Sequence, residues 1–561
     1  MSSGPYVLGI DFGTLSGRAV VVDAATGEQL GTHVTEYPHG VMDTTLTAGD
    51  GRSLPPEFAL QDPRDYVEVL RRSVPAAVEA AGVEASDIVG IGIDATSATV
   101  LLTDRDGTPL CEKPGFENDI HAYVKLWKHH GTQNQATRLV KIAEARREPW
   151  LARYGGVLSS ELLLPKVLEV FEMAPQTYAA ADVVVDLVDW LTWRLTGALT
   201  AAAGDSGYKR MLQDGSYPSR EYLEAVRPGF GSVYEDRMDY PVIPLGGRVG
   251  GLTAEFAELM GLPEGISVAA GNIDAHVVVA GANAVRPGQL TAILGTSSCY
   301  ILNDRQYHDC PGVLGIVDGG AVDGSWGFEA GQTAVGDIFA WFVDHCVPAE
   351  YEREAAARGL SAHELLVEKA SGQEIGEHGL VVLDWHNGNR SILADARLSG
   401  LVLGQTLATR PEDVYRALLE ATAFGCRVII ENFEEHGIGV DEIVAAGGLL
   451  RNTTYMQLLA DVTRRPISVS LAEQTGALGA AVFAAVAAGV HPDVFVAADA
   501  MASVERNAYV PRETVSEQYD ALYDIYKELH DLFGRYNGVS PMHRLKEIRA
   551  RIFRDRAPAG A

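Results

Sequence analysis

Two glycine-rich segments that carry hydroxyl side chains have the composition of phosphate-binding turns. The first turn, Asp11-Phe12-Gly13-Thr14-Leu15-Ser16, lies between two apolar runs, which together predict a β-hairpin. Gly13 lets backbone N–H groups approach an anion closely, and Thr14 and Ser16 add hydrogen-bond donors. Asp11, at the end of the first strand, is placed for a magnesium shell. An ordinary Asp/Gly hairpin explains this turn equally well on its own.

The same pattern recurs far down the chain. The second turn, Gly295-Thr296-Ser297-Ser298, interrupts the apolar run from Ile293 to Leu302. Two such hairpins so far apart suggest two similar half-molecules that face one nucleotide. A third segment, from Ile443 to Asn452, is an apolar strand that ends in the pair Gly447-Gly448 before a helix. Its bare backbone could receive a flat adenosine.

Carboxylates at predicted strand ends are the remaining chemical candidates. Asp94 and Asp274 each follow an apolar strand, and both would lie at the C-terminal edge of a sheet, where ligands of α/β folds bind. Asp274 precedes a helix-like run, so its side chain would emerge into a cleft; a helix N-cap is the alternative. Asp94, followed by Thr96 and Ser97, could likewise be a cap or a turn. His276 is interpreted as a structural histidine.

Other familiar signatures are missing from the sequence. There is no G-x-x-x-x-G-K-[ST] loop, no glycine-rich dinucleotide fingerprint, and no H-E-x-x-H or G-x-S-x-G motif. The five cysteines are scattered, which offers neither a disulfide framework nor a zinc cluster and favours a reducing cytoplasm. We find no signal peptide, and the longest uncharged stretch, 475–490, is too short for a membrane span and predicts a buried helix.

Length and charge limit the classes of partner. The chain has 561 residues, enough for two large domains, and a net charge of −30 argues against nucleic acid. No membrane partner is expected either. A basic tail is interpreted as the solvated end of a terminal helix, rather than as a nucleic-acid or membrane patch. It contains Arg544, Lys546, Arg549, Arg551, Arg554 and Arg556.

Apolar runs and helical patterns alternate along the chain, which predicts the α/β class. A turn at Arg286-Pro287-Gly288 places a domain boundary near residue 284, giving domains 1–284 and 285–561. The segment 515–536 predicts a long amphipathic helix whose aromatic stripe docks on the protein. The strands are expected at 6–12, 18–23, 88–94, 99–104, 183–191, 267–274, 289–296, 298–302, 379–385, 442–448 and 466–470, and helices include 64–82 and 136–146.

Taken together, these segments resemble the FGGY carbohydrate kinases. The paired hairpins, the segment Gly271 to His276 and the late Gly-Gly pair occur in that family's order, and Gly400-Leu401-Val402-Leu403-Gly404 followed by Ala417-Leu418-Leu419-Glu420 is similar to its signature. The resemblance covers nearly the whole chain. It implies a two-domain actin-like (ribonuclease H-like) ATPase fold with a cleft between the domains, with the sugar and phosphates on the N-terminal side and adenosine on the C-terminal side.

Within that family the chain is most similar to the kinases of L-ribulose. The segments that carry this similarity are 127–130, 327–332 and 381–388. Many family members have Trp-x-Asp where this chain has Trp127-Lys128-His129, and Lys-x-x-Trp where it has Lys166-Val167-Leu168-Glu169. Both departures from the family pattern lie in the region that is expected to bind the sugar. Trp127 itself is a second-rank candidate, since core packing explains a tryptophan equally well.

The resemblance implies roles for individual residues. Both turns would hold the phosphates of ATP, Asp11 would hold Mg²⁺ through water, and the late glycines and Asn452 would line the adenosine site. Asp274 would accept the proton of the attacking terminal hydroxyl, for which an ordinary carboxylate pKa is sufficient. The nucleotide residues are thus Asp11, Gly13, Thr14, Ser16, Gly295, Thr296, Ser297, Gly447, Gly448 and Asn452. The sugar residues are Ser97, Lys209, Asp274 and Glu329.

The implied activity is ATP-dependent phosphorylation of the C5 hydroxyl of a ketopentose, above all of L-ribulose in the catabolism of L-arabinose. Lys209 would donate to the sugar and Glu329 would accept from it, although a surface lysine also explains Lys209. The alternatives are a family member acting on xylulose, ribitol or glycerol, or a non-catalytic sugar-binding regulator or filament subunit of the same fold. A homodimer is possible.

Overall fold

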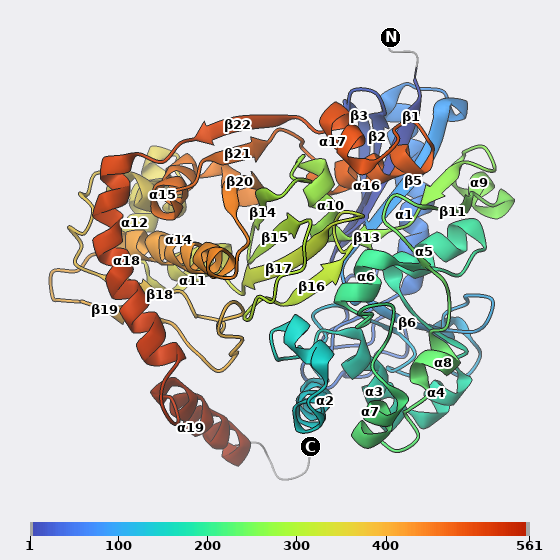
Figure 1. Ribbon diagram of the computed structural model, residues 1–561, viewed down its shortest axis with the longest axis horizontal. Coiled ribbons are helices and arrows are strands. Elements are labelled where there is room, and N and C mark those ends of the chain that lie inside the picture. The colour runs from blue at the N-terminus through green and yellow to red at the C-terminus, as the bar shows by residue number, and fades with distance from the viewer. Residues whose placement is uncertain (1–3, 557–561) are drawn as a thin grey trace.

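Two large mixed β-sheets, one in each half of the chain, organise the protein (Figure 1). The structure is a computed structural model, and it describes residues 4–556. The first sheet has the order β11-β12-β5-β1-β2-β3, with β13 beside β5. Its strands are β1 (Tyr6–Phe12), β2 (Ser16–Asp23), β3 (Gln29–Glu36), β5 (Ile88–Ala95), β11 (Arg248–Gly251), β12 (Ser267–Ala269) and β13 (Asn272–Ile273).

The second sheet has the order β16-β17-β15-β14-β20-β21-β22. Both predicted hairpins form, because β1 pairs antiparallel with β2 and β14 with β15. In each half the first hairpin strand also pairs parallel with a later strand, β5 or β20. The strands are β14 (Gly288–Leu294), β15 (Ser298–Asp304), β16 (Gly315–Asp318), β17 (Trp326–Gln332), β20 (Val440–Ala446), β21 (Ile467–Ser470) and β22 (Val504–Tyr509).

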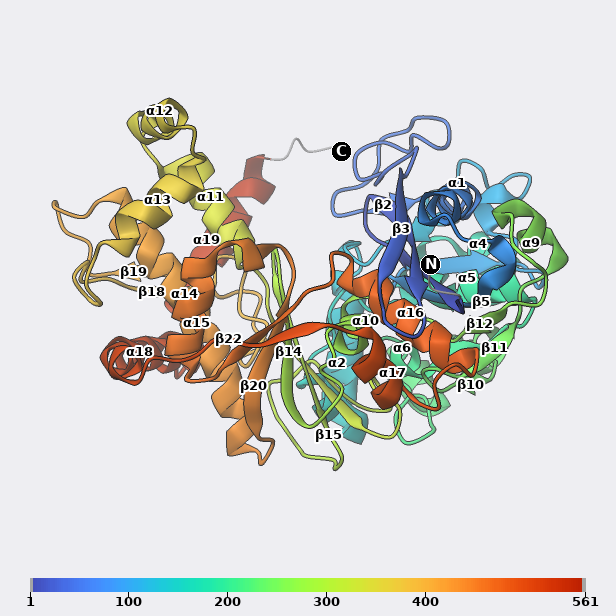
Figure 2. The ribbon, with the colours of Figure 1, turned by 90° about the horizontal axis from the view of Figure 1, so that it is seen from above.

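Helices cover both faces of the first sheet. Helix α1 (Pro63–Ala81) packs on β2 and β3, and its first turn is capped by Asp62, which accepts from the Arg64 N–H. The opposite face is covered by α16 (Thr475–Ala487), far along the chain, and Figures 1 and 2 both show α16 and α17 (Val494–Met501) beside this sheet. A Cβ on Gly9 of β1 would lie 1.8 Å from the Ala477 carbonyl oxygen, so glycine permits this close packing.

A smaller four-stranded sheet lies within the N-terminal half. Its order is β4-β7-β6-β8, and it has a hydrophobic core of its own. The expected strand at 183–191 is only partly correct, because the chain turns into helix α5 at Leu187. Helix α5 is buried almost throughout, and such an apolar run lacks the periodicity that distinguishes a strand from a helix. The elements are β4 (Leu60–Gln61), β6 (Val100–Thr103), β7 (Val124–Lys125), β8 (Val183–Asp186), α2 (Gln133–Arg146), α3 (Leu163–Met173), α4 (Pro175–Ala180), α5 (Leu187–Thr196), α7 (Arg220–Val226) and α8 (Val233–Arg237).

The remaining elements link or cover the sheets, and the expected strand at 379–385 forms at β18. They include β9 (Ala201–Ala202), α6 (Ala203–Tyr208), β10 (Val242–Ile243), α9 (Ala254–Met260), α10 (Asp274–Gly281), α11 (Gly336–Cys346), α12 (Ala349–Arg358), α13 (Ala362–Ser371), β18 (Val381–Leu383), β19 (Leu401–Leu403), α14 (Pro411–Glu435), α15 (Thr453–Thr463), α18 (Glu513–Gly534) and α19 (Pro541–Arg556). Among residues 4–556, no helix has the length and apolar character needed to cross a membrane.

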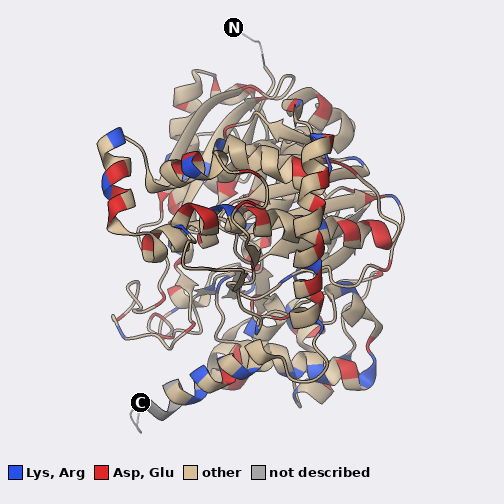
Figure 3. Ribbon diagram, turned by 90° about the vertical axis from the view of Figure 1, so that its left-hand side faces the viewer, with Lys and Arg blue, Asp and Glu red and all other residues tan. Residues whose placement is uncertain are grey.

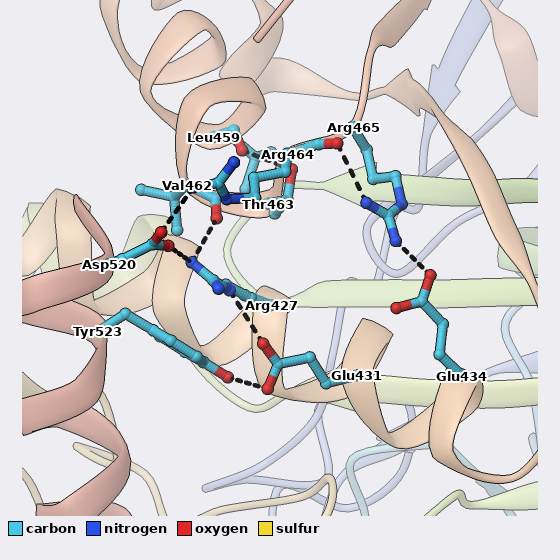
Figure 4. Close-up of polar contacts among 10 residues, drawn as sticks. All are labelled: Arg427, Glu431, Glu434, Leu459, Val462, Thr463, Arg464, Arg465, Asp520 and Tyr523. Carbon is cyan, nitrogen blue, oxygen red and sulfur yellow. Dashed lines mark hydrogen bonds and ion pairs between the residues drawn. The ribbon is translucent and has the colours of Figure 1, made fainter. Parts of the chain in front are cut away.

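Helix α18 docks on the C-terminal half through the predicted aromatic stripe. Tyr519, Tyr523 and Tyr526 are buried, and all three rings lie near the ring of Phe424 in α14. Polar contacts reinforce this packing (Figure 4). The Arg427 guanidinium lies 4.0 Å from the Tyr523 ring centroid and pairs with Asp520 at 2.7 Å and Glu431 at 3.0 Å.

The last helix, α19, carries the basic tail along the surface (Figure 3). Met542 is buried, and His543 lies 2.6 Å from the Asp395 carboxylate, which anchors the start of the helix. Arg544, Arg549 and Arg551 are exposed, as expected for a solvated helix end. The side chains of Arg554 and Arg556 lie outside those that the structure describes.

Candidate active site

Three carboxylates gather at the C-terminal edge of the first sheet. In the register of the parallel strands Asp11 of β1 lies opposite Asp94 of β5, and Asp94 lies opposite Asn272 of β13, two residues before Asp274. Burial raises the pKa of Asp94 well above its usual value, and the neighbouring charges of Asp11 and Asp274 raise it further. Both carboxylate oxygens of Asp94 are buried and have no hydrogen-bond partner within residues 4–556.

Asp274 is the first residue of α10, not its N-cap. Ile273 occupies the N-cap position, and the Asp274 carboxylate accepts a 2.8 Å hydrogen bond from the Ala275 N–H. Burial, and secondly the negative charge of Asp11, raise the pKa of Asp274 to about 7. This value is higher than the ordinary carboxylate pKa that the sequence argument treats as sufficient. A carboxylate with this pKa can accept a proton close to neutral pH.

A buried charged cluster joins the two halves next to Asp274. Glu329 lies on β17, Lys209 directly follows α6, and His276 lies on α10. The Glu329 carboxylate is 3.2 Å from Lys209 Nζ and 3.1 Å from His276 Nε2. Burial alone would raise the pKa of Glu329, but Lys209 and His276 hold it well below the usual range. Burial lowers the pKa of His276. Because an ionised carboxylate can only accept hydrogen bonds, His276 Nε2 is the donor to Glu329. Two of the four residues assigned to the sugar, Lys209 and Glu329, are therefore in contact.

His276 is a residue whose place in this cluster the sequence argument missed. The sequence predicts a structural histidine here; the structure shows it buried, in contact with Glu329, with its ring centroid 4.4 Å from that of Tyr208. Its Nδ1 atom is buried without a hydrogen-bond partner in the described part of the chain. The available signal was its position two residues after Asp274 at the start of a helix.

The protein holds the first turn by its carbonyl groups. The Tyr37 hydroxyl donates to the Gly13 carbonyl at 3.0 Å, and Gln61 Nε2 donates to the Thr14 carbonyl at 2.8 Å. Trp127 Nε1 donates to Thr14 Oγ1 at 3.1 Å, and the Gly13 N–H bonds to the Ser16 carbonyl. With these carbonyls engaged by the protein, the amide side of the turn is the side that suits an anion.

The second turn abuts the start of helix α11. The Val335 N–H donates to the Thr296 carbonyl at 2.8 Å, the Gly336 N–H donates to the Gly295 carbonyl at 3.0 Å, and the Gly295 N–H bonds to the Ser297 carbonyl. The positive end of the helix dipole therefore lies beside this turn.

The segment after β20 lies against the second turn. Gly447 has φ of 106°, and a Cβ there would lie 2.4 Å from the carbonyl oxygen of Leu294, so only glycine fits. A Cβ on Gly448 would meet no atom within 4 Å, which leaves its backbone open on that side. Asn452 caps α15 by accepting from the Tyr455 N–H at 3.0 Å.

Ser97 lies on the loop between β5 and β6. It is half-buried, and its carbonyl accepts from the Thr99 hydroxyl at 3.4 Å. The same loop is tied to the first hairpin, because the Thr96 N–H donates to the Phe12 carbonyl at 3.1 Å. A role for the Ser97 side chain in sugar binding stays a prediction.

Comparison with known proteins identifies the family to which this chain belongs. The model for the FGGY family of carbohydrate kinases matches in two parts, its N-terminal domain over residues 6–281 and its C-terminal domain over residues 290–488. The chain belongs to this family. As an FGGY kinase it is similar to a ribulokinase of Mycolicibacterium smegmatis, with 51% identity over 545 residues that cover 97% of this chain and 96% of that protein. A ribulokinase of Shouchella clausii is 46% identical and covers 97% of this chain and 98% of its own length.

Solved structures share the fold of this FGGY kinase. A gluconate kinase from Lactobacillus acidophilus has a TM-score of 0.78 at 17% identity, covering 95% of this chain and 98% of that one. A xylulose kinase from Rhodospirillum rubrum has a TM-score of 0.76 at 22% identity, covering 95% and 99%. The two-domain, actin-like α/β fold expected from the sequence is confirmed. The boundary near residue 284 and the individual site residues stay predictions.

Proposed function

We propose that this carbohydrate kinase transfers the γ-phosphate of ATP to the C5 hydroxyl of L-ribulose, yielding L-ribulose 5-phosphate. The observation that carries the proposal is the pair of carboxylates at the junction of the halves, half-buried Asp274 as a free base and buried Glu329 as a fixed acceptor. The names of the two relatives, both ribulokinases at 46% identity or more over nearly the whole chain, support ribulose as the acceptor. The reaction would serve the breakdown of L-arabinose.

Asp274 is assigned the role of general base. As the C5 hydroxyl attacks the γ-phosphate, its proton passes to the Asp274 carboxylate, whose other interaction is the hydrogen bond from Ala275. In a loose transition state the proton leaves late, so a base with a pKa of about 7 is sufficient near neutral pH. Most of the catalysis then consists of positioning and of stabilising charge on the phosphoryl group.

The two turns would bind the phosphates of ATP from opposite halves. Thr14 and Ser16 supply hydroxyls in the first turn, and Thr296 and Ser297 supply them in the second. The N-terminus of α11 beside the second turn adds a favourable dipole. Adenosine would lie on the open backbone of Gly448, with Gly447 fixing the bend and Asn452 at its edge.

The acidic group at the sheet edge fits a divalent cation. Asp11 and the partnerless oxygens of Asp94 face each other, and the nearest counter-charge is Arg18, 3.5 Å from Asp11. Within the described residues no cluster of three or more His, Cys, Asp or Glu side chains could hold a metal by itself. Mg²⁺ commonly uses one or two carboxylates together with phosphate oxygens and water, so we assign it to Asp11 through water. It would neutralise phosphate charge.

Lys209 and Glu329 would recognise the sugar hydroxyls. Their mutual contact keeps a donor and an acceptor fixed in one orientation, and His276 contacts the same carboxylate oxygen of Glu329, Oε2, as Lys209 does. A polyol needs such pre-set donors and acceptors, because flexible ones lose entropy when they bind. Ser97 would contribute from the neighbouring loop.

A coupled assay of ADP release over L-ribulose, D-ribulose, D- and L-xylulose, ribitol and glycerol, with ATP and magnesium, tests the proposal. We expect kcat/KM to be highest for L-ribulose. A higher value for xylulose, ribitol or glycerol would reassign the acceptor within the family. Binding of a sugar without ADP release would instead indicate a non-catalytic sensor.

We further propose that the protein is cytoplasmic and forms a homodimer. Light scattering of the purified chain would measure its oligomeric state.

A further inference from the structure

Two charged side chains are completely enclosed on one face of helix α3. Lys166 is 0% exposed and Glu169 is 4% exposed, and they lie three residues apart, so both project from adjacent turns of the same face. Buried charged residues need partners, since desolvation is costly. Their partners lie in two loops that border the proposed sugar and phosphate sites.

Lys166 joins the two loops directly. Its Nζ donates to the Ala98 carbonyl at 2.6 Å and to the Leu126 carbonyl at 2.8 Å. Burial lowers the pKa of Lys166 to about 7, and an amine donates both hydrogen bonds whether it is charged or neutral. Its contribution here is therefore geometric.

The loop at Ala98 needs such a restraint. Ala98 has φ of 46°, a left-handed conformation that is unfavourable for a residue with a Cβ. It follows Ser97, and the Thr96 and Thr99 hydroxyls, 2.9 Å apart, close the loop on the other side. The hydrogen bond from Lys166 to the Ala98 carbonyl holds the strained residue in place.

Glu169 holds the second loop at both ends. Its carboxylate lies 2.7 Å from Lys125 Nζ and 3.1 Å from His129 Nε2. His129 in turn accepts from the Ala59 N–H through Nδ1, at 3.2 Å. His129 and Glu169, which depart from the usual family pattern at two separate places in the sequence, thus contact each other in the fold.

This second loop leads to the first turn. Lys125, Leu126 and His129 are fixed by α3, and between them Trp127 donates to Thr14 Oγ1. Helix α3 therefore sets the distance between the Ser97 loop and the Trp127 side chain, and Trp127 in turn contacts the turn assigned to phosphate.

We propose that Lys166 and Glu169 are positioning residues for the acceptor sugar, which hold the Ser97-Ala98 loop and Trp127 as two walls of the ketopentose site without touching the substrate. The proposal rests on the function proposed above.

The test compares Lys166→Met and Glu169→Gln with the wild type, with Lys141→Met, an exposed lysine on α2, as a matched control. We expect Lys166→Met to raise the KM for the ketopentose at least tenfold and to change the preference among the panel sugars. The KM for ATP should stay within twofold. Glu169→Gln should act in the same direction with a smaller effect, since the amide retains one hydrogen bond.

A second pair perturbs the same loop without touching α3. Ala98→Val should reproduce the rise in sugar KM, because a β-branched residue disfavours φ of 46°, whereas Ala98→Gly should behave as wild type. If Lys166→Met is not recovered folded, the Ala98 pair decides the question. An equal rise in the KM for the sugar and the KM for ATP, together with a lower thermal midpoint, would overturn the proposal. Unchanged kinetics in all variants would also overturn it. A wild type inactive on every sugar would instead refute the proposed function.

Discussion

Two carboxylates of the candidate site, Asp274 and Glu329, have pKa values that are displaced in opposite directions. Asp274 has burial and a neighbouring carboxylate, which raise its pKa to about 7, whereas Glu329 has Lys209 and His276, which hold its pKa low. A base must be able to take up a proton, and a hydrogen-bond acceptor for a sugar must stay ionised. The two environments therefore separate the proposed catalytic group from the proposed binding group.

The first prediction concerns the proton acceptor. Asp274→Asn should reduce kcat at least about 10²-fold, because the amide cannot take up the proton, while the Kd for ATP changes little. In the wild type the base must be ionised, so kcat/KM should fall about tenfold per pH unit below pH 7 and level off above it. Steady-state rates from pH 5.5 to 8.5, with excess coupling enzymes, measure this. A profile flat down to pH 5.5 would argue against Asp274.

The second prediction concerns sugar recognition. Glu329→Gln leaves Lys209 without its counter-charge and removes an ionised acceptor, so the ketopentose KM should rise about tenfold or more, equivalent to ~1.4 kcal/mol. The KM for ATP should change far less. Asp323→Asn, a change of acidic residue on a nearby turn outside the cluster, serves as the control. Equal KM changes for both substrates would place the sugar elsewhere.

How much of the site could be predicted differs between its residues. Asp11 and Asp274 stand out in the sequence because polar residues end apolar strands, and strand ends meet at one sheet edge. The contact of His276 with Glu329 could not be predicted, because it joins elements 53 positions apart whose approach depends on how the halves pack. The raised pKa of Asp274 likewise depends on burial, which the local sequence does not encode.

At the scale of elements, the strand–turn–helix segment at Gly447-Gly448 contains two adjacent glycines with different roles. One is needed for the fold, and the other is assigned to binding. Gly447 is required by the backbone, because its φ is positive and Leu294 blocks a Cβ, whereas Gly448 has open space. The sequence shows two equivalent glycines, and only the structure distinguishes them.

The third prediction uses this difference. Gly447→Ala should destabilise the protein by roughly 1–3 kcal/mol, because it forces a strained backbone and a clash. Gly448→Ala should leave the thermal midpoint unchanged but raise the KM for ATP, because the added methyl would occupy the face assigned to adenosine. Differential scanning fluorimetry and ATP kinetics on both variants check this. An unchanged ATP KM in Gly448→Ala would exclude that face.

The fourth prediction concerns the docking of α18. Arg427 is largely buried and contacts Glu431, Asp520, the Val462 carbonyl and the Tyr523 ring (Figure 4). Arg427→Ala should therefore lower the thermal midpoint by several degrees, with loss of about 1–3 kcal/mol, and leave both KM values unchanged.

The control for Arg427 is Arg358→Ala, whose ion pair with Glu368 is exposed to solvent and should therefore contribute little to stability. Equal midpoints for the two variants would contradict a stabilising role for the Arg427 network.

Helix α18 itself was predictable from its aromatic spacing. Its partner surface on α14 was not, because that surface is assembled by residues about 100 positions earlier.

At the scale of the whole molecule, the order of the chain and the order of packing differ. Helices α16 and α17 belong to the C-terminal part of the sequence, yet they pack on the first sheet (Figure 2). A Cβ on Gly476, in the first turn of α16, would lie 3.6 Å from the Asp11 carboxylate. The late helix thus completes both the core of the first sheet and the edge on which the carboxylates gather. A division at one point in the sequence cannot separate the two halves cleanly.

The fifth prediction follows from that packing. A fragment of residues 1–284 lacks α16, so it would expose the apolar face of β1 and β5, including the small-residue strip at Gly9 and Gly92. We expect it to aggregate or to bind hydrophobic dyes when expressed alone, and to become soluble when it is co-expressed with residues 285–561. Full-length protein treated identically is the control, monitored by gel filtration and hydrogen exchange of β1. A fragment that is monomeric and shows native protection of β1 by itself would show that the first sheet does not need the late helix, and that its closing role is dispensable for folding.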